Sequence, residues 1–179
     1  MSMLFNADFP LLFLSRAQAA EIDALTARVI PSEPGSPGAR EAGVVEYIDR
    51  TLAGFGRDLQ GHYRDGLARL AGVVAADFGA ESFAELGEDD QDTVLARLDR
   101  LEEDDPLGQF FLLVREHTVQ GFFGDPAYGG NRDTVGWRLI GYPGAQWGYD
   151  AEQMRPGFDT ASIPVLTVAD LYRRRGGNR

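Results

Sequence analysis

Residues 105–123 decide the fold of this chain, and they read DPLGQFFLLVREHTVQGFF. Asp105 followed by Pro106 is typical of a helix start, because Asp caps free backbone N–H groups and Pro is tolerated in the first turn. Apolar residues then recur at helical spacing: Leu107, Phe110, Phe111, Val114 and Phe122, with Leu112, Leu113 and Val119 widening the apolar surface nearly all round. A helix that is apolar on most sides is buried. We therefore expect this segment to be the central, most buried helix.

Apolar residues at spacings of three and four predict more helices before it. Three predicted helices run from Ser15 to Pro31, from Gly38–Arg40 to Phe55 and from Leu59 to Asp77. A short helical turn is predicted at Ser82–Leu86, and another helix after a cap at Asp89 or Asp90. Ser15 and Gln18 have the spacing of a capping box. Prolines and glycines at residues 31–38 predict a stiff loop.

After the central helix the pattern breaks at residues 121–144, which read GFFGDPAYGGNRDTVGWRLIGYPG. No helical or strand period is present, and only Trp137–Ile140 suggests a short extended piece. Disordered linkers are poor in aromatic residues, whereas this stretch is rich in them. It is therefore expected to be an ordered irregular loop, and ordered loops of this length are usually functional. Farther on, Thr167 is the expected cap of a last helix, Val168–Arg175.

These patterns predict a mainly α protein. The expected architecture is a compact bundle of about five or six helices with a long ordered, irregular C-terminal segment rich in glycine and aromatic residues. At 179 residues the chain is expected to form a single domain. Its expected parts are an N-terminal extension (1–14), a helical core (15–123) and an irregular C-terminal segment with a short last helix (124–179).

Composition excludes several classes of function. A net charge of -11 argues against nucleic acid as a partner, and no apolar run approaches the roughly 20 residues of a membrane span. The chain has no Cys, which excludes disulfides and thiolate chemistry. Neither a signal peptide nor a twin-arginine motif is present, so the sequence as written predicts a cytoplasmic protein. The alternative is the periplasm, if the chain is exported with a partner or the sequence is trimmed.

The residues offer little for catalysis or metal binding. There are two histidines, and His117 is expected to be a core or interface histidine bonded to a carbonyl. Two scattered histidines without cysteine make a zinc site very unfavourable. The acidic stretch Glu81–Asp105 lacks the pattern of a calcium loop, and no glycine-rich nucleotide motif follows a strand. We expect neither metal nor cofactor in this chain.

The loop after the central helix leaves two questions open. Asp125, Asn131, Arg132 and Asp133 form a polar site or, as we favour, simply build the turn through side chains that bond nearby backbone. Its aromatic residues either cap the helical core or form a contact surface, since Tyr, Trp and Arg are enriched at binding hot spots. These aromatic residues are Phe122, Phe123, Tyr128, Trp137, Tyr142 and Trp147.

Three blocks of sequence resemble the gluconate 2-dehydrogenase subunit 3 family. The first combines Val29–Pro31, Pro37–Gly43 and Tyr47–Asp49, the second is Tyr63–Leu67, and the third is the 121–144 stretch. The third is the most specific, especially Gly124–Asn131 with Gly136-Trp137. Together the blocks span roughly residues 15 to 147.

The resemblance implies a non-catalytic small subunit of a bacterial sugar or polyol dehydrogenase. Its partner would be a large subunit of the glucose-methanol-choline type that binds FAD, with a cytochrome c subunit or another electron acceptor. The small subunit would be needed for the assembly of the flavoprotein. Many members carry a twin-arginine signal, which this sequence lacks, so an export role is not implied.

With this resemblance, we predict that the loop binds the partner subunit. The predicted contact residues are Phe123, Asp125, Pro126, Tyr128, Gly129, Gly130, Asn131, Arg132, Trp137 and Tyr142. Two alternatives are a small sugar-binding module and, less favoured, a stand-alone enzyme that uses His117, Asp125 and Asp133.

Overall fold

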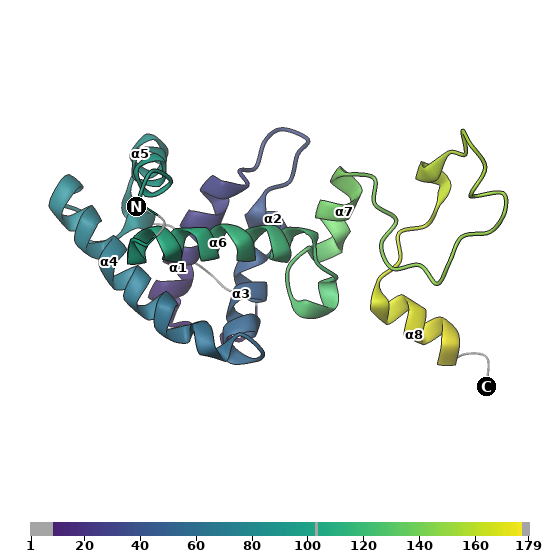
Figure 1. Ribbon diagram of the computed structural model, residues 1–179, viewed down its shortest axis with the longest axis horizontal. Helices are drawn as coiled ribbons and strands as arrows, with labels where there is room; N and C mark the ends of the chain where they lie inside the picture. The colour runs from purple at the N-terminus through teal and green to yellow at the C-terminus, as the bar shows by residue number, and fades with distance from the viewer. Residues whose placement is uncertain (1–8, 103, 177–179) are drawn as a thin grey trace.

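The computed structural model describes residues 9–102 and 104–176, and within these residues all regular structure is helical (Figure 1). The described residues form eight α-helices and several short 3-10 turns, which confirms the mainly α fold. The described residues contain no β-strand, only isolated bridges between Glu33 and Ser36 and between Gly144 and Leu166. None of the described helices combines the length and apolarity that a membrane span requires.

Helix α1 (Arg16–Val29) begins as the sequence predicts. The Ser15 hydroxyl accepts a hydrogen bond from the Gln18 N–H at 3.2 Å, and the Gln18 side chain accepts one from the Ser15 N–H at 2.9 Å. This capping box satisfies two backbone donors at the helix start. Leu14 and Ala19 on either side of the cap are both buried.

The single helix expected from Gly38–Arg40 to Phe55 is in fact two helices. Helices α2 (Ala39–Ala42) and α3 (Val44–Ala53) meet at Gly43, whose φ of 69° is a left-handed conformation that glycine adopts without steric cost. The sequence also places Phe55 on the apolar stripe, but Phe55 lies beyond the end of α3 and is 76% exposed. Glycines on both sides of Phe55 end the helix before its ring can turn inward.

Helix α4 (Gln60–Phe78) follows the 3-10 turn Arg57–Leu59 and ends before Gly79, close to its predicted range. It buries one apolar stripe, made of Tyr63, Leu67, Leu70 and Val74. The short turn predicted near Ser82–Leu86 is the 3-10 turn Phe83–Glu85, and Phe83 is fully buried.

Helix α5 (Glu88–Leu98) begins slightly earlier than expected. Its N-cap is Gly87, so the caps predicted at Asp89 or Asp90 are wrong. Both residues instead lie in the first turn, where a carboxylate interacts favourably with the positive end of the helix dipole.

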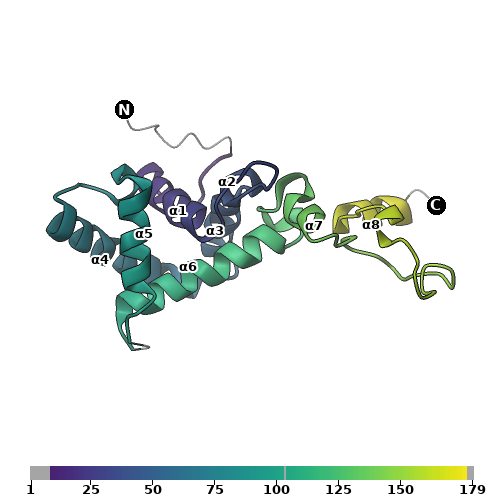
Figure 2. The same cartoon turned by 90° about the horizontal axis from the view of Figure 1, so that it is seen from above.

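Helix α6 (Pro106–Phe123) runs through the core and packs against α1, α3, α4 and α5 (Figures 1 and 2). As predicted, Asp105 caps it, with the carboxylate accepting hydrogen bonds from the N–H groups of Leu107 and Gly108 at 2.8 and 3.2 Å. The expectation of burial nearly all round is wrong, since Leu112 and Val119 are each 50% exposed. The neighbouring helices cover the opposite side of α6 and leave this side open.

The N-terminal extension predicted for residues 1–14 is described from Phe9 onward, and residues 1–8 lie outside the described residues. The segment is held by Asp49 of α3, which has no exposed surface. The Asp49 carboxylate accepts hydrogen bonds from the backbone N–H groups of Leu12, Phe13 and Leu14 at 2.6, 3.0 and 2.8 Å. These three donors satisfy the buried Asp49 carboxylate, whose burial without hydrogen-bond partners would cost free energy.

Past α6, a short helix α7 (Val135–Leu139) replaces the extended piece expected at Trp137–Ile140. The chain then forms what we call the C-terminal arm, residues 140–176, which ends in α8 (Val168–Gly176). In both views the arm lies beyond α7, away from α1–α6 (Figures 1 and 2).

Helix α8 begins at the predicted cap, Thr167. The Thr167 hydroxyl accepts a hydrogen bond from the Asp170 N–H at 3.2 Å, and the Asp170 carboxylate accepts one from the Thr167 N–H at 2.9 Å. Hydrogen bonds from the Thr167 backbone and hydroxyl lower the pKa of Asp170 to about 2. Asp170 therefore stays ionised at neutral pH and holds the first turn of α8.

Candidate functional site

The loop between α6 and the arm is folded into a series of tight turns. Two 3-10 turns, Pro126–Tyr128 and Arg132–Thr134, lead into α7. Asp125 caps the first turn, since its carboxylate accepts a hydrogen bond from the Ala127 N–H at 2.9 Å. This is the turn-building role that the sequence favours for the polar residues of the loop.

Asn131 is the internal anchor of the loop and has no exposed surface. Its side-chain amide donates to the Gly124 carbonyl at 2.7 Å, and its side-chain oxygen accepts from the Gly136 N–H at 2.9 Å. One side chain therefore joins the end of α6 to the start of α7. Its φ of 44° lies in the left-handed region, which Asn tolerates better than most residues.

The glycines of the loop allow its backbone to lie directly against α6. A Cβ atom at Gly130 would lie 2.1 Å from the Gly121 carbonyl oxygen, and one at Gly136 would lie 2.0 Å from the Phe122 carbonyl oxygen. Real Cβ atoms do not approach backbone this closely. The aromatic and glycine content of the stretch is thus explained by close packing rather than by mobility.

Trp137 closes the end of the core. Its indole N–H donates to the Phe123 carbonyl at 2.6 Å, and its side chain is only 5% exposed. Tyr142 packs on it edge-to-face, with ring centroids 5.4 Å apart, and keeps 45% of its own surface exposed. Trp137 therefore caps the helical core, whereas Tyr142 is placed to form a contact surface.

The exposed side of the loop carries charge. The Arg132 guanidinium lies 3.6 Å from the carboxylate of Glu46, which also pairs with Arg50 at 2.6 Å. Asp133 and Thr134 follow with φ values of 54° and 57°, an uncommon conformation for residues with a Cβ. Strained backbone of this kind persists only where its surroundings hold it, as Asn131 does here.

Asp125 also reaches the arm. The second oxygen of its carboxylate accepts a hydrogen bond from the Val168 N–H, the first residue of α8, at 2.7 Å. A residue predicted to contact a partner is therefore used to fix the arm to the loop.

His117 lies in the core, 4% exposed, and its Nδ1 is 2.9 Å from the Tyr63 hydroxyl oxygen. The core location agrees with the sequence, but the bonded group is a tyrosine hydroxyl and not the expected carbonyl. Burial lowers the pKa of His117, which the charge of Glu116 opposes, and burial raises the pKa of Tyr63. Both side chains are therefore neutral at pH 7, and the tautomer of His117 decides which of the two donates the hydrogen bond.

The residues of the alternative enzyme hypothesis are not brought together. His117 bonds Tyr63, Asp125 bonds the backbone of Ala127 and Val168, and no hydrogen bond within the described part of the chain links the two groups. Asp133 is exposed. A nucleophile–base pair needs direct hydrogen-bond contact, which this arrangement does not provide.

The ten predicted contact residues divide by exposure. Gly129, Gly130, Asn131 and Trp137 are buried, Phe123, Asp125 and Pro126 are half-buried, and Tyr128, Arg132 and Tyr142 are exposed. Those in the interior shape the loop, while Tyr128 and Tyr142, 59% and 45% exposed, are free to touch another molecule.

Several exposed apolar side chains were missed by the sequence reasoning. Tyr149, Met154 and Tyr172 of the arm are 45%, 68% and 65% exposed. Tyr149, which follows Gly148 in irregular sequence, carries the same signal that marked the loop, whereas Met154 and Tyr172 carry no such signal.

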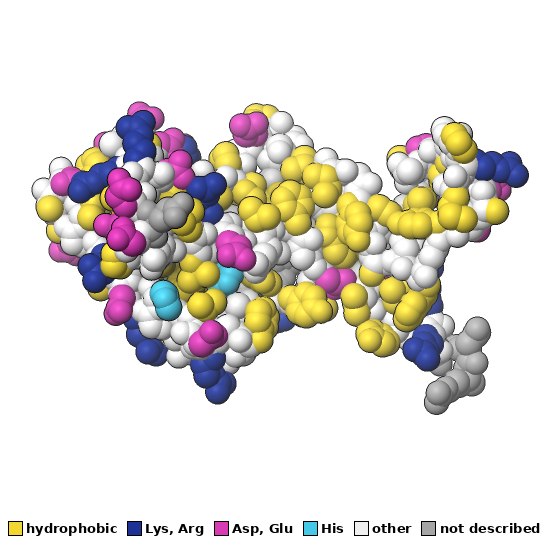
Figure 3. Space-filling model, in the orientation of Figure 1, with side chains coloured by type: hydrophobic (Ala, Val, Ile, Leu, Met, Phe, Trp, Pro, Cys, Tyr) yellow, Lys and Arg dark blue, Asp and Glu magenta, His cyan; other side chains and the backbone are white. Residues whose placement is uncertain are grey.

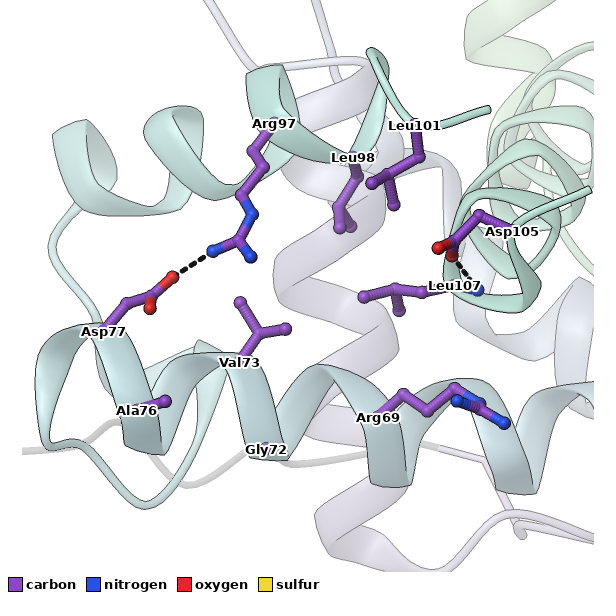
Figure 4. A pocket seen from close by; sticks show the side chains of 10 residues that line it. All are labelled: Arg69, Gly72, Val73, Ala76, Asp77, Arg97, Leu98, Leu101, Asp105 and Leu107. Carbon is purple, nitrogen blue, oxygen red and sulfur yellow. Dashed lines mark hydrogen bonds and ion pairs between the residues drawn. The ribbon is translucent and has the colours of Figure 1, made fainter. Parts of the chain in front are cut away.

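A pocket of about 400 Å³ lies between α4, α5 and the start of α6 (Figure 4). Its floor is apolar, with Val73, Leu98 and Leu107 pointing inward, and Arg97 pairs with Asp77 across its mouth. Asp105, also in its lining, is engaged in capping α6. No group of three or more His, Cys, Asp or Glu side chains in the described residues is placed to hold a metal ion.

Comparison with protein-family models matches residues 16–144 to gluconate 2-dehydrogenase subunit 3. The match confirms the resemblance inferred from the three sequence blocks, and it spans α1 to α7. It ends at Gly144, so most of the arm lies outside it. Comparisons with curated proteins and with solved structures give no significant match.

Proposed function

Because the chain belongs to the gluconate 2-dehydrogenase subunit 3 family, and is therefore a small subunit of a dehydrogenase complex, we propose that it assembles a flavoprotein subunit of that complex. The partner would be a bacterial FAD-dependent dehydrogenase of the glucose-methanol-choline type that oxidises a sugar or polyol. That partner would bind FAD and abstract hydride, and a cytochrome c subunit or another acceptor would take the electrons. The observation that carries this proposal is the family match over residues 16–144.

The roles of the polar side chains support a non-catalytic subunit. His117 and Tyr63 satisfy each other inside the core, Asp125 holds two backbone N–H groups, and Asn131 spans the loop. Each of these four side chains already has a structural partner. The family region is thus built as a rigid scaffold, and a rigid scaffold presents a surface with little entropy cost on binding.

The surface offered by the family region is the outer side of the loop. Tyr128 and Tyr142 combine large apolar area with a hydroxyl and have few rotatable bonds, which suits them to interfaces. Arg132 lies between these two tyrosines in the sequence, is partly exposed and pairs with Glu46. We propose that this side contacts the flavoprotein.

Co-expression with an FAD-dependent dehydrogenase subunit from the same genome tests the proposal. The flavoprotein is expected to be soluble, loaded with FAD and active only when the two are produced together. A flavoprotein that reaches the same solubility, flavin content and specific activity alone would overturn it.

Two loop variants and one control sharpen the test. Tyr128→Ala and Tyr142→Ala should reduce the amount of flavoprotein that copurifies. Phe55→Ala removes an even more exposed ring just beyond the end of α3, outside the loop, and should leave copurification unchanged.

A further inference from the structure

The C-terminal arm exposes an unusual set of large apolar side chains. They are Ile140, Tyr142, Trp147, Tyr149, Met154 and Tyr172, and each is between 45 and 68% exposed. Apolar side chains are prominent over α7 and the arm in Figure 3. Contiguous exposed apolar surface of this kind marks interaction sites in soluble proteins.

The arm holds its shape through its own contacts, so the exposure is part of the fold. The Ala145 N–H donates to the Leu166 carbonyl at 2.7 Å, and the Leu166 N–H donates to the Pro143 carbonyl at 3.0 Å. The Gln146 side chain donates to the carbonyls of Pro143 and Pro164 at 2.9 Å each. Inside the arm Ile163, Leu166 and Leu171 are buried, while the aromatic residues named above point outward.

At the tip of the arm an aromatic side chain meets two arginines. A hollow of about 520 Å³ is lined by Trp147, Arg174 and Arg175. Arg173 pairs with Asp170, whereas Arg174 and Arg175 form no ion pair with the described residues. Guanidinium groups bind carboxylates in a fork geometry, and an indole ring offers a flat apolar surface, so the hollow suits an acidic segment that carries an apolar side chain.

The distribution of charge along the chain favours the same occupant. Residues 1–123 contain 10 arginines and 22 acidic residues, whereas residues 124–179 contain 7 arginines and 6 acidic residues. An acidic partner surface is therefore repelled by the helical core and attracted to the tip. Complementary fields of this kind orient a complex and raise the association rate.

We propose that the tip of the arm, formed by Trp147, Arg174 and Arg175, binds an acidic segment of the flavoprotein subunit. This inference rests on the proposed function and adds the place and chemistry of the contact. The tip lies outside the region that matches the family, which ends at Gly144. The outer side of the loop and the tip would thus act together, and the tip would determine which flavoprotein this chain accepts.

The test measures the affinity of the purified full chain for the flavoprotein. Trp147→Ala is expected to weaken binding about 30-fold, the size of a hot-spot loss. Arg174→Glu/Arg175→Glu is expected to weaken it at least as much and to flatten or reverse its dependence on salt, because the attraction that salt screens is replaced by repulsion. Arg174→Lys/Arg175→Lys keeps the charge without the fork and should give an intermediate loss.

The matched control reverses two arginines of the core. Arg69 and Arg100 are exposed and form no ion pair with the described part of the chain, so Arg69→Glu/Arg100→Glu makes the same charge change elsewhere. It should bind like the wild type. Circular dichroism of every variant should match the wild type, because all the substituted side chains are exposed.

The outcomes separate this inference from the proposed function. If the wild-type chain binds the flavoprotein and the tip variants bind equally well, the inference is wrong and the proposed function stands. If the wild-type chain neither binds nor supports the flavoprotein, the proposed function fails. If the tip variants instead dissolve a dimer of this chain seen by ultracentrifugation and leave flavoprotein binding intact, the occupant is a second copy and the inference is overturned.

Discussion

The carboxylate of Asp125 accepts a hydrogen bond from the backbone N–H of Val168 at 2.7 Å, across 43 residues of sequence. Val168 opens α8, and its N–H is one of those that a helix start leaves without an internal partner. The other oxygen of Asp125 caps the turn at Ala127. One carboxylate therefore fixes the loop and the arm to each other.

Asp125→Ala should loosen α8 while leaving the helical core intact. A hydrogen bond to a charged group contributes about 1.5–3 kcal/mol, so we expect amide hydrogen exchange in α8 to speed up by about tenfold or more. Asp159→Ala is the control, since Asp159 caps a separate turn of the arm through the Ala161 N–H at 3.0 Å. Equal exchange in α8 for the two variants would show that Asp125 does not hold the arm.

Asn131→Ala should destabilise the whole protein. It removes two buried hydrogen bonds, leaves the Gly124 carbonyl and the Gly136 N–H unpaired, and forces a left-handed φ on alanine. We expect a loss of about 2–4 kcal/mol in the free energy of unfolding, measured by urea denaturation. Tyr128→Ala, three residues earlier and exposed, should change this value by less than about 0.5 kcal/mol.

Two glycines of α4 should respond to alanine in opposite directions. A Cβ at Gly66 would lie 2.1 Å from Cγ of the buried Phe110 ring, whereas one at Gly72 would meet nothing within 4 Å. Gly66→Ala should therefore cost about 1–3 kcal/mol through overpacking, and Gly72→Ala should gain about 0.5–1 kcal/mol through helix propensity. Thermal unfolding of both variants measures the difference, and a shift of the same sign in both would contradict this packing of α4 on α6.

The sequence predicted those features that depend on nearby residues. The Ser15–Gln18 capping box, the Asp105 cap and the Thr167 cap of α8 are all local signals, and each is confirmed. The apolar stripe of α4 was likewise visible, because its residues recur at a fixed spacing. The family was also recognised from short blocks of sequence.

Features that depend on distant residues were not predictable in the same way. α7 is only five residues long, too short to show a period, and its Trp137 is positioned by the carbonyl of Phe123 in another helix. Asp49 is buried because it binds backbone N–H groups more than 30 residues away. In the candidate site, the buried position of Asn131 was hidden because polar loop residues are usually exposed, and here tertiary hydrogen bonds override that tendency.

The buried His117–Tyr63 pair should make stability depend on pH. Burial lowers the pKa of His117 in the folded state below its ordinary value of 6.5, so the unfolded chain binds the proton more readily. The contribution of His117 is therefore complete above about pH 6.5 and is lost as the pH falls below that value. His117→Gln keeps a polar side chain next to Tyr63 but cannot titrate, so it should be less stable than the wild type at pH 7.5, and this difference should shrink at pH 5.5.

Melting temperatures at the two pH values measure the effect, with His62→Gln, an exposed site at the start of the same helix as Tyr63, as the control. A difference between His117→Gln and wild type that stays constant from pH 7.5 to 5.5 would mean that the imidazole does not titrate against folding.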